Sequence, residues 1–553
     1  MPVLRTTYGT NLGLPLVFGK ARDRRPRKAH VGGGRTGLIE NLENRMLLSA
    51  APHGWHHHST STTSNTQTTA STTTAAAAPT ATTTTVDAAA STTTDTAASP
   101  AATVTNPIAG DANSDGIVNL ADYKQIVPYY NVVKTGATWA QGDFNGDGAV
   151  NYSDMLLYQS NYGKSGGTSG GSSGGTSGSI TAASTQPPAG VTWSSPLVIT
   201  QGGTYTGNWQ STSANTPAIT VKTSQPVTIL NSNIQSRGDL IASGVSHINV
   251  TVKGTHGWGL NPNVAGRSPG RFLDVDNFDN LDIENNTMVG TAGMYMAYYA
   301  GNGTTSNSVK ILKNNALNID GRWSDGNGGY QTGTDANDLV QFAQFNACHN
   351  MTGVEIAWNQ VVNQPGQSRV EDNISVFQSS GTASSPLLIH DNYIQGAYPA
   401  DPANDGSFTG GGIMVSDGNT NSASTDTGHV RCYNNVVIGT ANYGIAVSSG
   451  LDNQVYNNTV ISSGLLPGGQ KVASQNVGIY VWNQSGDPFF QAPQVFGNTI
   501  GWNGPSGRND EWTPDASGVS DTSMSGSITQ STEAQAYNAW VQRVSAAGQT
   551  VGA

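Results

Sequence analysis

The segment IENNTM at residues 283–288 decides the fold, because its pattern recurs along the second half of the chain. An apolar residue is followed by two residues, an asparagine, one residue and a second apolar residue. Later copies are ILKNNA at 311–316, IAWNQV at 356–361, IHDNYI at 389–394, CYNNVV at 432–437, VYNNTV at 455–460 and VFGNTI at 495–500. Successive asparagines are 28, 45, 33, 43, 23 and 40 residues apart. The shortest spacing is typical of one turn of a β-solenoid, and spacings of 40 and more predict two turns.

The recurring asparagine has a physical reason to lie at a bend between two strands. Asparagine tolerates left-handed backbone and bonds locally, which favours a tight bend. Stacked asparagine side chains can also hydrogen-bond to one another from turn to turn. The intervals carry a second signature, glycine followed by alternating apolar residues, as in GMYM at 293–296 and GIYV at 478–481. These repeats predict an all-β fold, a right-handed parallel β-helix (solenoid) of about ten to twelve rungs.

Residues 179–553 resemble the right-handed β-helix family of secreted bacterial proteins. The resemblance is carried by ITQGGTYTGNW at 199–209 and by residues 368–399. That family includes pectate-lyase-like polysaccharide lyases, alginate lyases and epimerases. The resemblance implies the fold and says little about the reaction, because one fold supports many functions. Apolar residues at helical spacing in 533–546 predict a helix that packs on a rung or an end and shields an edge.

Composition excludes several classes of protein. The 553-residue chain is too long for one ordinary domain. Only 11% of its residues are charged, which disfavours a helix-rich enzyme, and the net charge of −11 argues against a nucleic-acid partner. The sequence contains no run of 18 apolar residues, so it predicts no membrane-spanning helix. Two cysteines cannot form a disulfide scaffold, and Cys432 falls at an apolar repeat position that predicts a buried thiol.

Two copies of a calcium-loop pattern precede the solenoid. They are DANSDGIVNLAD at 111–122 and DFNGDGAVNYSD at 143–154. Each places oxygen-bearing side chains at loop positions 1, 3, 5, 9 and 12 and glycine at position 6, where the chain must turn sharply. Calcium prefers six to eight oxygen ligands, so the pattern predicts one ion in each loop. The last ligand is aspartate instead of the glutamate of ordinary EF-hands.

The two loops and the stretches that follow them resemble a type I dockerin, a small α-helical calcium-binding domain. The resemblance implies two calcium ions, folding coupled to metal binding, and a cohesin-type protein partner. Carried over position by position, the ligands are Asp111, Asn113, Asp115, Asn119 and Asp122 in the first loop, and Asp143, Asn145, Asp147, Asn151 and Asp154 in the second.

The N-terminal region predicts export. The segment LENRMLLSA at 42–50 resembles the LEPR-xLL motif of planctomycete proteins, with Asn44 where that motif has proline. The resemblance implies a secreted or cell-surface protein. The chain then divides into a basic export segment (1–50), a disordered Ser/Thr/Ala-rich stalk (51–105), the dockerin-like domain (106–164), a Gly/Ser linker (165–178) and the β-helix with its C-terminal helix (179–553).

Aligning the repeats on asparagine predicts which side chains face outward. The residue three positions before asparagine should point inward, and those two and four positions before it should point outward. Lys310, Glu355 and His390 then lie on one outer face, with Tyr433 and Tyr456 beside His390. Charges and aromatic rings suit a polysaccharide, although a solvated outer face explains the same pattern.

A second charged cluster is RVEDN at 369–373, with Arg369, Glu371 and Asp372. It is a candidate for a further calcium ion, for an acid/base pair, or for a structural ion pair that anchors a loop. The Gly- and Asp-rich inserts 321–338 and 398–411 flank this region and could wall a groove. We therefore expect any active groove near Lys310, Glu355 and Arg369–Asp372. The predicted catalytic residues are Lys310, Glu355, Arg369, Glu371, Asp372 and His390.

These features leave three functions open. The first is a polysaccharide lyase, which needs a base near the acidic C5 proton of a uronate and a cation on its carboxylate. The second is a glycoside hydrolase, which needs two carboxylates across a groove. The third is a non-catalytic glycan-binding surface or matrix protein. The sequence favours a lyase on a uronate-containing polysaccharide, tethered through the dockerin-like domain.

Overall fold

The computed structural model describes residues 108–115, 118, 122, 125–126, 128–129, 133, 135–146, 148–150, 154, 157–158, 161, 178–303, 309–333, 335–420 and 422–553. The predicted export segment, the stalk and all but the last residue of the linker lie outside these described residues. The predicted calcium ligands Asn119, Asp147 and Asn151 lie outside them as well.

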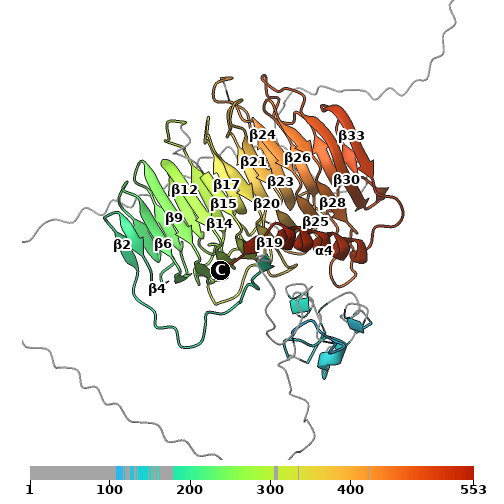
Figure 1. The fold of residues 1–553 in the computed structure, drawn as a ribbon, viewed down its shortest axis with the longest axis horizontal. Coiled ribbons are helices and arrows are strands. Elements are labelled where there is room, and N and C mark those ends of the chain that lie inside the picture. The colour runs from blue at the N-terminus through green and yellow to red at the C-terminus, as the bar shows by residue number, and fades with distance from the viewer. Residues whose placement is uncertain are drawn as a thin grey trace, which may run out of the picture.

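The large domain is a solenoid built from three ladders of parallel strands, which we name ladders A, B and C (Figure 1). Ladder A is an 11-stranded sheet. Its strands are β2 (Leu197–Ile199), β5 (Ile219–Val221), β8 (Ile241–Ser243), β11 (Leu273–Asp276), β14 (Gly293–Ala297), β17 (Gln341–Asn346), β20 (Asp372–Phe377), β23 (Gly411–Asp417), β26 (Tyr443–Val447), β29 (Val477–Val481) and β32 (Glu511–Trp512).

Ladders B and C belong to one 21-stranded sheet, because the long strand β30 (Gln494–Gly504) pairs with the last strand of each ladder. Ladder B also contains β3 (Gly203–Tyr205), β6 (Val227–Leu230), β9 (Ile248–Lys253), β12 (Phe278–Glu284), β15 (Val309–Leu312), β18 (Glu355–Ala357), β21 (Leu387–His390), β24 (Val430–Tyr433), β27 (Gln454–Tyr456) and β33 (Ser517–Ser523). Ladder C contains β4 (Asn208–Ser211), β7 (Asn233–Ser236), β10 (His256–Gly259), β13 (Thr287–Val289), β16 (Asn315–Leu317), β19 (Gln360–Val362), β22 (Tyr393–Ala397), β25 (Val436–Thr440) and β28 (Thr459–Ser462). The short strand β31 (Gly507–Arg508) folds back antiparallel on β30.

The parallel solenoid predicted from the repeats is confirmed. Eleven strands in ladder A agree with the expected ten to twelve rungs. Ile283, Ile356 and Ile389, each three positions before a repeat asparagine, are fully buried, and they join one continuous apolar core. Cys432 is a buried free thiol at the same repeat position, as expected.

The recurring asparagines form a hydrogen-bonded ladder along the solenoid. From Asn286 to Asn458, the Nδ2 atom of each repeat asparagine donates to Oδ1 of the next one at 2.9–3.0 Å. Each Nδ2 also donates to a backbone carbonyl of the preceding rung, as Asn392 does to Ile356 at 2.9 Å. The ladder ends where Asn498 donates to Asp521, because a carboxylate can accept the bond but cannot pass it on.

The left-handed bend falls one residue earlier than predicted. Positive φ angles occur at Asn285 (55°), Lys313 (57°), Trp358 (59°) and Asp391 (54°), each directly before a ladder asparagine. The prediction that the repeat asparagine itself adopts this backbone is wrong. The bend turns the chain, and the asparagine that follows it forms hydrogen bonds across rungs. Lys313 and Trp358 are therefore held in a backbone conformation that costs a residue other than glycine about 1 kcal/mol.

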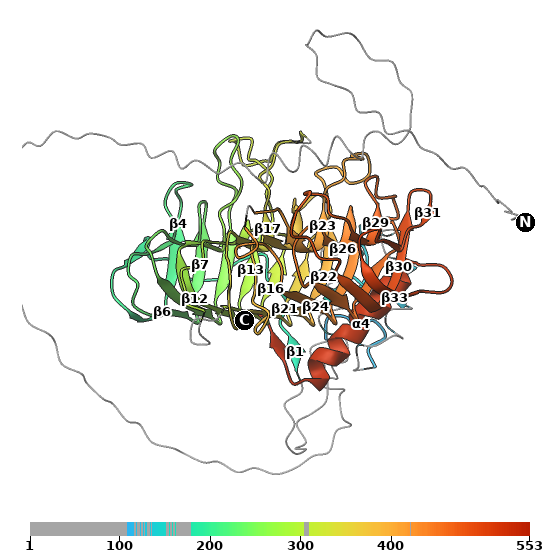
Figure 2. The ribbon, with the colours of Figure 1, turned by 90° about the horizontal axis from the view of Figure 1, so that it is seen from above.

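The long spacings between asparagines are also explained differently. Asn314 and Asn359 are bonded directly although they are 45 residues apart, and so are Asn392 and Asn435. The prediction that such spacings contain two turns is wrong. Long connections account for the extra residues, among them 318–340 and 398–410 between ladders C and A and 418–429 between ladders A and B. In Figure 2, long connections extend beside β17, β23 and β29 of ladder A.

The predicted C-terminal helix is present as α4 (Gln530–Ala546), capped by the Thr529 side chain. It lies along the outer face of ladder C beside β25 and β28, so it covers a face of the solenoid (Figure 1). The Trp540 indole donates to the Asp391 carbonyl at 2.7 Å and packs on Tyr393. After α4 the chain returns as β34 (Thr550–Val551), which pairs with β1 (Ser179–Ile180).

The smaller domain has its own core. Ala112, Val118, Ile126, Val150 and Tyr158 are buried together. Helical residues begin at the last position of each loop. They are 122 and 125–126 for the first loop, and 154, 157–158 and 161 for the second. The short 3₁₀ helix η1 (Trp139–Gln141) precedes the second loop. In the part of the chain that the structure describes, no helix has the length and apolar character needed to cross a membrane.

Candidate functional site

The first predicted calcium loop brings its carboxylates together. Oxygens of Asp111, Asp115 and Asp122 lie within 4.8 Å of one another. Backbone amides hold these groups in place: the Asp115 amide donates to Asp111 Oδ1 at 3.1 Å, and the Asn113 amide donates to Asp122 Oδ1 at 3.1 Å. Convergent carboxylates on a tight turn fit a hard divalent cation, so these residues suit calcium.

In the second loop, backbone amides likewise donate to the first and last predicted ligands, Asp143 and Asp154. The Asp143 carboxylate accepts the amides of Gly146 and Gly148 at 2.8 and 3.0 Å, and Asp154 Oδ1 accepts the amides of Phe144 and Asn145 at 2.8 and 3.2 Å. Gly148, the glycine predicted at the sharp turn, has a φ of 83°, which a side chain would strain.

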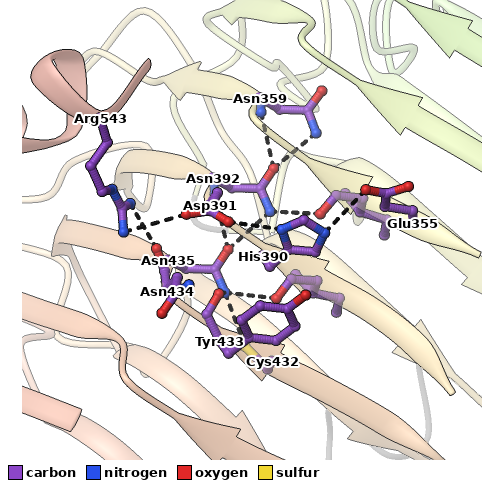
Figure 3. A network of polar contacts seen from close by, with 12 residues as sticks. Glu355, Asn359, His390, Asp391, Asn392, Cys432, Tyr433, Asn434, Asn435 and Arg543 are labelled. Atoms are coloured by element: carbon purple, nitrogen blue, oxygen red, sulfur yellow. Dashed lines mark hydrogen bonds and ion pairs between the residues drawn. The ribbon is translucent and has the colours of Figure 1, made fainter. Parts of the chain in front are cut away.

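Three predicted catalytic residues meet on the outer face of ladder B. Lys310 Nζ lies 2.8 Å from Glu355 Oε2, and His390 Nε2 lies 3.2 Å from Glu355 Oε1. His390 Nδ1 lies 2.9 Å from Asp391 Oδ2, and Arg543 of α4 lies 3.4 Å from the same carboxylate (Figure 3). These contacts join three successive rungs and the C-terminal helix.

The electrostatics of this network favour a structural role. The hydrogen bond from His390, supported by Lys310, lowers the pKa of Glu355 to about 2 despite its partial burial. Burial lowers the pKa of His390, but its bonds to Asp391 and Glu355 outweigh that effect and raise it. Glu355 therefore stays ionised and His390 favours its charged form. A histidine held charged between two carboxylates is a poor general base.

Aromatic rings continue upward from His390 as a stack. The ring centroids of His390 and Tyr433 are 4.8 Å apart, those of Tyr433 and Tyr456 are 5.0 Å apart, and those of Tyr456 and Phe496 are 5.1 Å apart, with interplanar angles of 11°, 7° and 3°. The ring faces therefore cover one another. A sugar that stacks on an aromatic residue needs a free ring face, so this column suits rung-to-rung packing better than glycan binding.

The other three predicted residues lie elsewhere. Arg369 and Glu371 are in the connection that leads from ladder C to ladder A, and Asp372 begins β20. They are 5%, 8% and 3% exposed. Glu371 accepts a 2.6 Å hydrogen bond from Thr409, and Asp372 accepts one from Tyr443. Arg369 lies 3.7 Å from Glu371. The structure thus separates these residues from Lys310, Glu355 and His390, because ladders A and B face different directions.

Sequence reasoning missed an acidic cluster on the outer face of ladder A. Asp274 and Asp276 are two residues apart on β11, so both carboxylates leave the same side of the strand. The Arg271 amide donates to Asp239 at 2.8 Å, and its guanidinium lies 4.8 Å from the centre of the Tyr295 ring. Tyr295 is the register neighbour of Asp274 on β14, and its hydroxyl accepts from Asn346 at 2.9 Å.

This cluster contains carboxyl groups whose pKa values are raised. Burial, reinforced by the neighbouring Asp239 charge, raises the pKa of Asp274 to about 7, with Arg271 opposing the shift. Burial also raises the pKa values of Asp239 and Asp276. A carboxyl that holds its proton near neutral pH beside a second carboxyl is the arrangement used in acid/base catalysis. The sequence signal was the alternation LDVD at 273–276, which an alignment of the ladder A strands would have placed beside GMYM.

A cavity of about 280 Å³ lies apart from both clusters. It lies beside the last rungs of the solenoid. Its lining includes Ser463, Lys471, Gln475 and Asn503. None of the predicted catalytic residues lines it. The residues that line this cavity do not form an acid/base pair. We therefore place the candidate active site at the Asp274 cluster on ladder A.

Comparisons with known proteins support the smaller domain. Residues 109–161 match the family model of the dockerin type I domain. Neither the search of curated proteins nor the search of solved structures gave a match. The chain therefore contains a dockerin type I domain, a calcium-binding module of extracellular proteins whose partner is a cohesin-type domain, joined to a parallel β-solenoid.

Proposed function

We propose that this protein is an exported enzyme that cleaves a polysaccharide on the outer face of ladder A, with Asp274 as general acid, and that its dockerin domain tethers it to a cohesin-bearing partner. The feature that carries the proposal is the carboxyl of Asp274, which lies beside Asp239 and Asp276 and whose pKa burial raises to about 7, so that part of it keeps its proton at neutral pH.

The geometry supports hydrolysis by paired carboxyl groups. Residues two apart on a strand have Cα atoms roughly 6.6 Å apart, so two carboxyl groups on the same face can reach the separations of roughly 5–9.5 Å that glycoside hydrolases use. Asp274 would donate a proton to the leaving oxygen, and Asp276 would act as base or nucleophile. The charge of Asp239 would help Asp274 keep its proton until substrate binds, whereas the Arg271 guanidinium favours release of that proton.

The surroundings of ladder A also suit a chain-like substrate. Long connections lie along both of its edges, 318–340 and 398–410 on one side and 418–429 on the other. Loops along a solenoid commonly form its binding face. Tyr295 is partly exposed next to Asp274 and offers a ring and a hydroxyl to a sugar.

The lyase prediction remains open but has less support. Lys310 is bonded to Glu355, Lys253 lies 2.8 Å from Asp282, and Lys313 forms an ion pair with Glu284. A lysine that acts as base must lose its proton, and a bound carboxylate opposes that loss. Catalysis by the paired carboxyl groups on ladder A does not require a lysine to lose its proton.

The test is to incubate the full chain with neutral and acidic polysaccharides and to follow two products. New reducing ends without ultraviolet absorbance from unsaturated uronates indicate hydrolysis, and both together indicate β-elimination. Asp274→Asn should slow reducing-end release by about 10²-fold or more, whereas Glu355→Gln should retain it. Retained glycan binding with no product in any assay would support the non-catalytic alternative and contradict the proposal.

A further inference from the structure

An unpaired carboxyl is buried at the corner between ladders A and B. Asp426 lies in the connection from β23 to β24 and is 3% exposed. Neither of its side-chain oxygens has a hydrogen-bond partner. The amides of Thr420 and Thr427 are near enough to lower its pKa, but neither completes a hydrogen bond to it. Leaving a carboxylate buried and unpaired is costly, so this site lacks a partner.

A second buried carboxyl faces it. Asp487, in the connection from β29 to β30, is also 3% exposed. Its oxygens accept the amides of Gly450 and Phe489 at 2.7 and 2.8 Å, and its side chain lies within hydrogen-bond reach of Asp426. Two carboxylates in contact repel each other, and they can remain together only if a proton or a cation lies between them.

Among the described residues, no cation is one of the groups that shift the pKa of Asp426. The charged group that acts most strongly on Asp426 is Asp487, which is itself acidic. His349 contacts the backbone of Thr425 next to the site, but burial lowers its pKa, so it is neutral at pH 7. A proton shared between Asp426 and Asp487 is the remaining alternative to a bound ion, and burial and Asp487 raise the pKa of Asp426 to about 6.

A third unpaired oxygen lies at the same level of the neighbouring rung. Ser449 is fully buried, and its hydroxyl has no hydrogen-bond partner. The parallel bridge between Gly428 and Leu451 aligns these two connections, and Ser449 and Asp426 each lie two residues before it. The corner therefore offers unpaired oxygens from two successive rungs and a carboxylate from the next connection.

We propose that Asp426, Asp487 and Ser449 bind a calcium ion that ties three connections together at the edge of ladder A. The donors are all oxygens, which favours calcium over metals that prefer nitrogen or sulfur. A divalent ion neutralises both carboxylates. The hydrogen bonds that Asp487 accepts from backbone amides do not prevent it from binding calcium. The predicted calcium ligands Asp111 and Asp143 in the dockerin loops accept hydrogen bonds from backbone amides in the same way.

The test uses the full chain and counts bound calcium by equilibrium dialysis with radioactive calcium. Wild type should bind one more ion per chain than Asp426→Asn or Asp487→Asn, because the dockerin loops are intact in all three. The matched control is Asp405→Asn, a partly exposed aspartate of another connection that caps the Ser407 amide at 2.9 Å. It should bind as many ions as wild type.

Thermal unfolding of the solenoid separates the ion from the shared proton. If calcium is bound, it should raise the melting temperature of wild type and leave that of Asp426→Asn unchanged. In chelator the order should reverse, because Asp426→Asn removes the repulsion with Asp487. Equal stoichiometry in wild type and Asp426→Asn, or a melting temperature that depends on pH near 6 and not on calcium, would overturn the proposal in favour of a shared proton.

Discussion

Asn392 Nδ2 donates a 2.9 Å hydrogen bond to Asn435 Oδ1 on the next rung, although 43 residues separate them. The same amide donates to the Ile356 carbonyl, and Asn392 Oδ1 accepts both the Nδ2 and the backbone amide of Asn359. One fully buried side chain therefore links three rungs. Removing it leaves several buried polar groups without partners.

Asn392→Ala should therefore destabilise the solenoid strongly. Each buried group left unpaired costs about 1–3 kcal/mol, so we expect a loss of at least about 3 kcal/mol in the free energy of unfolding. Chemical denaturation followed by circular dichroism measures it. Asn327→Ala, at an exposed turn, should change stability by less than about 0.5 kcal/mol. Equal effects of both variants would contradict a structural asparagine ladder.

The network around His390 should make stability depend on pH in two windows. The pKa of Glu355 falls from 4.5 to about 2 in the folded state, so its contribution is complete above about pH 4.5 and is lost as the pH falls toward 2. The pKa of His390 is raised above 6.5, so its contribution is complete below that pH and is lost as the pH rises through the folded value.

His390→Gln is the variant that isolates the upper window. Melting temperatures of wild type should fall as the pH rises above 6.5, and those of His390→Gln should not show that step. In the same variant the pKa of Glu355 should be lowered less, because the hydrogen bond from His390 makes the largest contribution to that shift. Stability should therefore depend less on pH between about 4.5 and 2. Parallel curves for both proteins would mean that the histidine stays neutral.

Calcium removal should affect the dockerin domain far more than the solenoid. The first loop brings the carboxylates of Asp111, Asp115 and Asp122 together, and a small domain with a thin core depends on the ion for folding. Limited proteolysis of the full chain in chelator should cut within residues 109–161 and leave a fragment close to 179–553. Asp122→Ala should show the same cleavage at calcium concentrations that protect wild type. Full protection in chelator would contradict the coupling of folding to metal.

Activity on a cleaved polysaccharide should fall as the pH rises through about 7, because Asp274 must carry a proton to act as general acid. Asp274→Asn should reduce kcat by about 10²-fold or more. Its melting temperature should not fall, since the substitution removes a buried carboxyl that resists ionisation. A variant that keeps the wild-type pH profile would exclude Asp274 as the acid.

Arg369→Ala and Glu371→Gln test whether the second predicted cluster is structural. Both side chains are more than nine-tenths buried, and Glu371 is bonded to Thr409. We expect lower melting temperatures, by several degrees, and activity per folded molecule close to wild type. Loss of turnover at an unchanged melting temperature would instead support the catalytic roles predicted from the sequence.

The sequence by itself determined the two features that depend on local or strictly repeated patterns. Calcium ligands such as Asp111 and Asp122 lie within twelve consecutive residues, so their spacing alone brings them together. The solenoid follows from a repeat in which Ile283, Ile356 and Ile389 always precede the asparagine by three positions, which fixes the inward face. The dockerin domain and the parallel fold were therefore predictable.

Only the tertiary structure decided which charged side chains meet. Connections of unequal length separate neighbouring rungs by 23 to 45 residues, so sequence distance does not give rung order. Asp239 and Asp274, or Asp426 and Asp487, come together because parallel pairing stacks successive rungs, and no local pattern marks these pairs. Lys310 and Asp372 are kept apart for the related reason that each rung turns between ladders that face different directions.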